Sequence, residues 1–212
     1  MKITLLTYCD KDFDRIGAIT IPIISEYCKV NSFEFVIHST ISTNHKDIYW
    51  NKIGLVKQNL ASNDWVIWCD ADIIINWFYL DWNAMFKRHA DKSLLVSSDF
   101  NGLCLGFFVI KANQWSINLL DIMEKLGDIN KGKIGVYHRK FQREQDTIKV
   151  LADFFAVIND QILLLPEEII ANPKSEINGT IPFAFHFWAS RGAAIVEQEM
   201  KQYLTRPPNS KD

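Results

Sequence analysis

Two aspartates separated by a single alanine stand directly after an apolar run in this chain. The run covers residues 65–69, and the acids are Asp70 and Asp72, with Ala71 between them. Unpaired carboxylates are costly in a core, so we expect the pair where a buried strand emerges at the edge of a sheet. Carboxylate oxygens there suit a hard divalent cation such as Mg²⁺ or Mn²⁺, which could hold a diphosphate.

An acidic pair of this kind is a weak signal alone, because charged loops often contain one. Here an apolar strand precedes it and three isoleucines, residues 73–75, follow it, which favours a metal site over a solvated loop. Asp72 is the expected direct ligand. Asp70 would bind the metal, directly or through water, or a ribose hydroxyl. The cation would neutralise a departing diphosphate as a Lewis acid, which is the setting of a nucleotide-sugar transferase.

Strands and helices alternate along the chain, which predicts an α/β sheet covered by helices on both faces. Pro22 predicts a kink or a late start in the first helix, which Asp14 can cap, while Asn113 caps and Gly127 ends the fourth helix. Predicted strands cover residues 3–9, 33–39, 65–69, 94–98, 106–111, 162–165 and 183–187. Predicted helices cover residues 14–28, 50–60, 80–89, 115–125, 144–155 and 193–204.

Polar residues follow several of the predicted strands. Residues 7–10, the acidic pair, and Ser98 with Asp99 all stand at the carboxyl ends of strands. In open α/β sheets the ligand binds outside these ends, so the three segments should converge on one site.

Length and composition limit the class of protein. A chain of 212 residues with 48% hydrophobic residues fits one globular domain, expected over residues 1–205. Residues 206–212 read as a linker or tail, to which further domains could be attached. The formal net charge of −2 argues against a nucleic-acid partner.

The cysteines and the apolar runs bear on the compartment. The four cysteines lack metal-binding spacing, so we expect free thiols, no zinc site and a reducing compartment. No apolar stretch is long enough to span a bilayer, and the amino terminus enters a strand without a signal peptide. These features predict a cytoplasmic location, which for a viral protein would be the host cytoplasm.

Several further motifs accompany the acidic pair. They are Trp50-Asn51-Lys52-Ile53, residues 106–111 with Gln114-Trp115-Ser116, Glu144-Gln145-Asp146, and His186. In this order they resemble the GT-A glycosyltransferases, most closely the galactosyl/xylosyl/mannosyl transferase family of yeast and plants. The resemblance covers roughly residues 3–190 and extends to the amino-terminal domain of a large chlorella-virus glycosyltransferase. It implies a Rossmann-like, mixed but mostly parallel sheet flanked by helices.

The resemblance also assigns nucleotide and metal ligands. Thr7 and Tyr8 match positions that cradle the base and ribose, and Lys52 matches a basic residue near the nucleotide face, unless it is a solvated helix lysine. His186 matches the histidine that completes the metal site, with a core histidine as the alternative; a nitrogen ligand favours Mn²⁺ over Mg²⁺. Arg191 could clamp the diphosphate, or lie on the surface. Ala71, Gln145 and Trp188 fall in the same matched segments, and we group them with the nucleotide-sugar ligands.

Three acids are candidates for the chemistry on the sugar. Glu144 and Asp146 open a predicted helix, where they would contact the donor sugar or the acceptor hydroxyl, or only pair with the helix dipole. Asp99 could bind donor hydroxyls, or be an ordinary loop acid. The family pattern usually has asparagine at position 104, where this chain has Cys104, and commonly has a glycine where Trp188 or Ser190 stands.

The resemblance predicts a metal-dependent glycosyltransferase that moves a hexose or deoxyhexose from a UDP-sugar donor to a glycan acceptor. A nucleotidyltransferase that makes nucleotide sugars is one alternative. It would normally have a glycine-rich loop after the first strand, and residues 8–12 contain no glycine. A non-catalytic nucleotide-sugar or glycan-binding domain is the other alternative, which Cys104 keeps open.

Overall fold

The computed structural model describes residues 1–40, 48–76, 80–99, 102–130, 144–166, 169–171, 181–188 and 192–205. The strands are β1 (Ile3–Tyr8), β2 (Glu34–His38), β3 (Trp65–Cys69), β4 (Ile73–Ile75), β5 (Leu94–Asp99), β6 (Gly102–Lys111), β7 (Ile162–Leu164), β8 (Ile170–Ala171) and β9 (Ala184–His186). The helices are α1 (Asp14–Asn31), α2 (Ile48–Leu60), α3 (Trp82–Arg88), α4 (Gln114–Asn130), α5 (Glu144–Phe154), α6 (Ala156–Asn159) and α7 (Ala193–Thr205).

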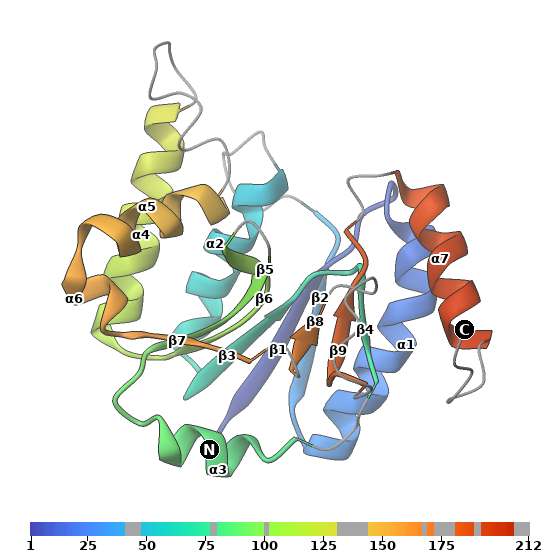
Figure 1. Ribbon diagram of the computed structural model, residues 1–212, viewed down its shortest axis with the longest axis horizontal. Coiled ribbons are helices and arrows are strands. Elements are labelled where there is room, and N and C mark those ends of the chain that lie inside the picture. The colour runs from blue at the N-terminus through green and yellow to red at the C-terminus, as the bar shows by residue number, and fades with distance from the viewer. Residues whose placement is uncertain are drawn as a thin grey trace.

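The strands form a six-stranded sheet in the order β2-β1-β3-β6-β5-β7 and a three-stranded sheet in the order β4-β9-β8 (Figure 1). Strand β1 pairs in parallel with β2 and β3, and β5 pairs in parallel with β7. Strand β6 is antiparallel to both β3 and β5, so it is the one reversed strand among the described strands of this sheet. The sheet is therefore mixed and mostly parallel, as predicted.

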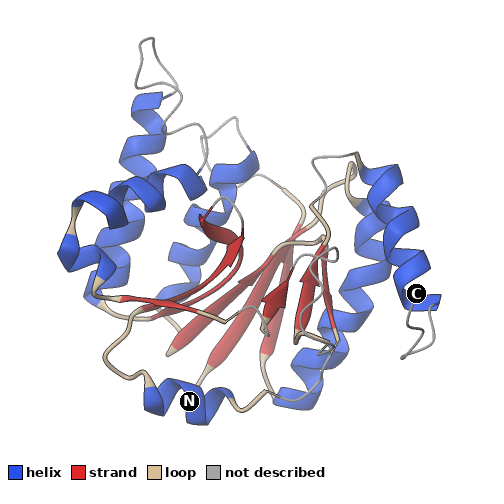
Figure 2. Ribbon diagram, in the orientation of Figure 1, coloured by secondary structure: helices blue, strands red, loops and turns tan. Residues whose placement is uncertain are grey.

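Both faces of the large sheet are buried, which explains why its central strands are apolar at successive positions (Figure 2). Leu5 and Ile67 belong to a cluster that includes residues of α1 and α3. Their neighbours Leu6 and Val66 belong to a second cluster, with residues of α2, α4 and α5. A third cluster joins α1 and α7 to β4 and β9. The alternating strand residues thus separate the helices into two layers.

The first helix starts at the predicted residue, but it ends three residues later than predicted and it is not capped as predicted. Helix α1 begins at Asp14 and runs through Pro22, because its buried stripe of Ile16, Ile24 and Tyr27 outweighs the missing amide. Asp14 does not cap it: the Asp10 side chain instead accepts hydrogen bonds from the backbone amides just before it.

Gly127 does not end α4, which continues to Asn130. A Cβ at Gly127 would lie 2.7 Å from the Trp50 ring, so this glycine allows α4 to pack closely on α2. The cap at the other end is confirmed, since the Asn113 side chain accepts a hydrogen bond from the Ser116 amide at 2.9 Å.

Two expectations from composition can be compared with the structure. All four cysteines are free, as predicted, and all four are buried. Among the described helices, none combines the length and the hydropathy needed to cross a membrane.

Candidate active site

A bulge in β6 shapes the edge of the large sheet beside the acidic pair. Val96 of β5 pairs with Phe108, but the next residue, Ser97, pairs with Cys104. The Ser97 hydroxyl closes the bulge by donating to the carbonyls of Cys104 at 3.0 Å and Phe107 at 3.1 Å. Bulges of this kind redirect a strand and interrupt its ladder, and they are common next to active sites.

Two carbonyls of β6 beside the bulge hold the loop and helix next to it. The carbonyl of Gly106 accepts from the backbone amide of Asp70 at 2.8 Å. The carbonyl of Leu105 accepts from the Lys52 ammonium at 3.1 Å. Backbone atoms of β6 therefore hold Asp70 directly and Lys52, its ion-pair partner, at this edge.

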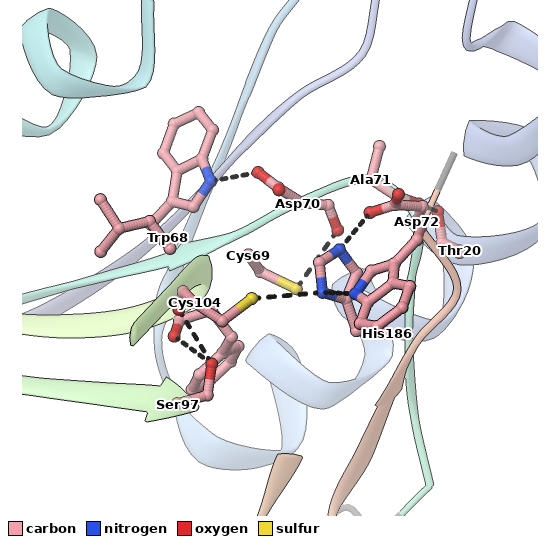
Figure 3. A network of polar contacts seen from close by, with 12 residues as sticks. Thr20, Trp68, Cys69, Asp70, Ala71, Asp72, Ser97, Cys104 and His186 are labelled. Carbon is pink, nitrogen blue, oxygen red and sulfur yellow. Dashed lines mark hydrogen bonds and ion pairs between the residues drawn. The ribbon is translucent and has the colours of Figure 1, made fainter. Parts of the chain in front are cut away.

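Asp70, Asp72 and His186 come together at this edge (Figure 3). Each offers one ligand atom, and these atoms all lie within 4.8 Å of one another. Asp72 and His186 are buried, whereas Asp70 is partly exposed. His186 Nε2 lies 3.2 Å from Asp72 Oδ1.

The pairing of two short strands brings His186 to the acidic pair. Asp72 directly precedes β4, and β4 pairs antiparallel with β9, where Ile73 stands opposite His186. The amide of Phe187 also donates to the Asp72 carbonyl at 2.9 Å. Two carboxylates and an imidazole nitrogen at this spacing form a suitable donor set for Mn²⁺ or a related divalent cation.

The ring of His186 is enclosed by three residues. Gly106 lies against it, and a Cβ at that position would come within 2.4 Å of Cε1. The Cys104 sulfur is 3.6 Å from Nδ1, and the Trp188 indole donates to Nδ1 at 3.1 Å. Burial alone would lower the pKa of His186, but the Asp72 carboxylate outweighs burial and holds the pKa well above its ordinary value.

Trp188 has a backbone φ of +38°, in the left-handed region that favours glycine. A glycine at this position would adopt that conformation without strain. Trp188 lies beside His186. Its indole contacts Nδ1, while Nε2, the other ring nitrogen, faces Asp72.

Lys52 lies beneath the acidic pair rather than on a solvated helix face. It is 6% exposed, and its ammonium is 3.0 and 3.2 Å from the two Asp70 oxygens and 3.1 Å from Glu144 Oε1. Burial alone would lower the pKa of Lys52, but the carboxylates of Asp70 and Glu144 outweigh burial and raise it. Lys52 therefore stays charged, and the reading as a solvated helix lysine is wrong.

The three residues that open α5 have different surroundings. Glu144 is 3% exposed, and burial raises its pKa although the Lys52 ammonium opposes the shift. Gln145 and Asp146 are only partly buried. The Gln145 side-chain oxygen accepts a hydrogen bond from the Leu105 amide at 3.2 Å, so it is also tied to the bulge.

The remaining predicted residues are distributed around the site. Thr7 is fully buried, and its hydroxyl has no hydrogen-bond partner within the described part of the chain. The Tyr8 hydroxyl donates to Asp10 at 3.3 Å, and burial together with Asp10 raises the pKa of Tyr8. Ala71 is buried, and its carbonyl accepts a hydrogen bond from Thr20 at 2.7 Å. Arg191 and the side chain of Asp99 lie outside the described residues.

Sequence reasoning missed two residues that hold the acidic pair. The Trp68 indole donates to Asp70 Oδ1 at 2.6 Å, and Thr20 fixes the carbonyl of Ala71 (Figure 3). The two-residue periodicity of a strand places Trp68 and Asp70 on the same side of the chain, so this signal was available in the sequence. The contact with Thr20 has no local signal, since α1 is far from the acidic pair in sequence.

We compared the chain with models of known protein families. Residues 76–191, more than half of the chain, match the model of the galactosyl transferase GMA12/MNN10 family. The chain belongs to this family. The match begins after the acidic pair and includes the bulge, the start of α5 and His186.

Several curated proteins similar to this GMA12/MNN10 chain come from plants. The chain is 24% identical over 114 residues to probable glycosyltransferase 7 of Oryza sativa subsp. indica, which covers 48% of this chain and 25% of the relative. It is 21% identical over 114 residues to galactomannan galactosyltransferase 1 of Cyamopsis tetragonoloba, which covers 48% of this chain and 26% of the relative. The chain thus spans about a quarter of the length of the relatives it matches.

Solved structures show the fold over nearly the whole chain. A glycosyltransferase involved in the glycosylation of the major capsid of PBCV-1 superposes with a TM-score of 0.75 at 12% identity, covering 95% of this chain and 100% of that chain. The galactosyltransferase LgtC superposes with a TM-score of 0.52 at 11% identity, covering 97% and 98% of the two chains. The predicted GT-A fold is therefore confirmed.

Proposed function

We propose that this GMA12/MNN10 chain is a metal-dependent glycosyltransferase that moves a hexose or deoxyhexose from a UDP-sugar to a glycan hydroxyl. The observation that carries the proposal is the group formed by Asp70, Asp72 and His186 at the carboxyl edge of a GT-A sheet. The family membership and the galactosyltransferases among the similar proteins support a hexose donor.

Some residues of the site are expected to bind the cation and the donor, whereas others bind neighbouring residues of the site. Asp72 and His186 would hold the cation, with Asp70 beside them, and the bound cation would neutralise the charge that develops on the diphosphate. The polar end of β1 at Tyr8 is the proposed nucleotide contact. Thr7 is buried, so we assign any contact there to its backbone.

Asp146 is our choice for the carboxylate that meets the sugar. Glu144 is buried and bound to Lys52, whereas Asp146 begins the same helix with a partly exposed side chain. The Asp146 carboxylate could accept the proton of an acceptor hydroxyl or stabilise positive charge on the donor sugar. Gln145 would orient the sugar beside it.

A nucleotidyltransferase is the less favoured proposal. Strand β1 leads through Asp10 directly into α1, and the connection contains no glycine-rich loop that could enclose a triphosphate. The Asp10 carboxylate accepts hydrogen bonds from the backbone amides of Asp12 and Phe13. An acidic side chain therefore occupies the amides that a phosphate would otherwise bind.

The test is a donor screen by calorimetry with Mn²⁺ and with EDTA, followed by hydrolysis assays on each nucleotide sugar that binds. We expect UDP and one UDP-sugar to bind only with the cation, because Asp70 and Asp72 would otherwise repel a diphosphate. Asp72→Asn should abolish the cation dependence and serves as the matched control. Equal affinity in EDTA would remove the metal from the proposal, and binding without any hydrolysis or transfer would favour a non-catalytic module.

A further inference from the structure

The Asp70 carboxylate, which is expected to face the metal, already forms an ion pair with the buried Lys52. Lys52 Nζ contacts both oxygens of Asp70, at 3.0 and 3.2 Å, and Trp68 donates to the nearer oxygen at 2.6 Å. Asp70 therefore has three short polar contacts with the protein itself. In a dicarboxylate metal site the cation balances the negative charge of the acids. Here the Lys52 ammonium already supplies part of that positive charge.

The ammonium of Lys52 is held where it is by other contacts. It also bonds the Leu105 carbonyl in the bulge at 3.1 Å and Glu144 at the start of α5 at 3.1 Å. These contacts come from β6 and α5, and the ammonium lies 5.6 Å from the centre of the Trp68 ring. A charge enclosed in this way is screened little by water or salt, so it repels a nearby cation more strongly than a surface lysine would.

We infer that Lys52 competes with the divalent cation for Asp70, so that the domain binds a free cation weakly and takes it up together with a diphosphate. This inference rests on the proposed function. The diphosphate supplies the negative charge that the site lacks when Lys52 neutralises Asp70. Lys52 is then a positioning residue that sets the order of binding, and it is not a nucleotide ligand.

The inference predicts opposite changes in Mn²⁺ affinity when Lys52 is removed together with Glu144 and when Glu144 alone is removed. Lys52→Met alone would leave the buried Glu144 without its cation, so the main variant is Lys52→Met combined with Glu144→Gln, which removes both charges. Glu144→Gln alone leaves Lys52 with Asp70 as its carboxylate partner and should strengthen the competition. Lys57→Met is the control, because Lys57 lies on the same helix but pairs with Asp121 and Glu124 of α4.

The measurement is Mn²⁺ affinity by calorimetry, with and without UDP, after thermal melting has confirmed that each variant is folded. We expect the double variant to bind Mn²⁺ alone about tenfold more tightly than wild type, and Glu144→Gln about threefold more weakly. The increase in Mn²⁺ affinity on adding UDP should shrink in the double variant. Lys57→Met should match wild type.

Other results would overturn the inference in distinct ways. A double variant that binds Mn²⁺ as wild type does, or more weakly, shows that Lys52 only supports the fold. Wild type that binds Mn²⁺ as tightly without UDP as with it also refutes the inference but leaves the proposed function standing. Wild type that binds no Mn²⁺ even with UDP refutes the proposed function itself.

Discussion

Gly106 lies directly against the imidazole of His186, with room for no side chain between them. A methyl group at Gly106 would come 2.4 Å from Cε1 and 2.8 Å from Nδ1, so either the ring or the bulge must move. The strand that carries Gly106 and the strand that carries His186 belong to different sheets. This contact therefore sets how closely the two sheets approach at the metal site.

We expect Gly106→Ala to weaken Mn²⁺-dependent UDP binding by at least about tenfold, because the displaced ring no longer faces Asp72. His186→Ala should have a similar effect, and the double variant should be no worse than His186→Ala, since residues in contact are not additive. Calorimetry on the three variants measures this. Additive losses would show that Gly106 acts on something other than the histidine.

The stability of the metal-free domain should depend on pH through His186. Burial alone would lower its pKa in the folded state, but the Asp72 carboxylate outweighs burial and raises it; Cys104 and Trp188 are the other polar neighbours of the ring. The stabilisation from such a histidine is fully present below the unfolded value of about 6.5 and is lost as pH rises through the folded value.

The free energy of unfolding in EDTA should therefore fall as the pH rises above about 6.5. Urea unfolding at a series of pH values measures it. In His186→Gln the same pH range should give a flatter profile, because the titrating group is gone. An identical slope in both proteins would assign the pH dependence to another group.

Cation binding should change the environment of Trp188. An imidazole that binds a cation through Nε2 carries its proton on Nδ1, and an indole can only donate. The present contact from Trp188 to Nδ1 requires a neutral ring with its proton on Nε2, so above the folded pKa of His186 a cation on Nε2 moves that proton to Nδ1 and the contact breaks. At a pH where His186 is neutral, adding Mg²⁺ and UDP should change the tryptophan fluorescence of wild type, and Trp188→Phe should lose that component; an unchanged response in the variant would contradict the prediction.

Asp146 and Glu144 should differ in which kinetic constant they affect. Asp146→Asn should spare UDP binding and reduce transfer by about a hundredfold, as expected for the loss of a general base. Glu144→Gln should act mainly on metal and donor affinity, because Glu144 touches Lys52 and lies away from solvent. Steady-state kcat and KM with a matched donor and acceptor separate the two, and wild-type turnover in Asp146→Asn would show that α5 begins with an ordinary charged cap.

Local pattern was sufficient for the elements that lie deepest in the fold. The apolar run of β3 has the predicted boundaries, because a central strand buried on both faces leaves a continuous apolar signature. The short strands β4 and β8 and the helix α6 were not predicted as elements. Their few residues carry no periodicity, and their pairing depends on chain segments far away.

The role of a charged residue was harder to predict than its presence. Lys52, Asp70 and Glu144 were all singled out, but nothing in a linear sequence says that one lysine bridges two carboxylates from different elements. The meeting of Asp72 with His186 likewise depends on the non-local pairing of β4 with β9. Family resemblance supplied that partner; spacing could not.

The reversed direction of β6 has a consequence for how this site can change in evolution. Strand β6 pairs antiparallel with β3, and its main-chain carbonyls of Gly106 and Leu105 accept from the Asp70 amide and from Lys52. Main-chain groups survive most substitutions, so this part of the scaffold is inherited with the topology and not with particular side chains. Side chains of β6 that make no contact with His186 can therefore change while the main-chain contacts to Asp70 and Lys52 persist; Gly106, which lies against the His186 ring, cannot.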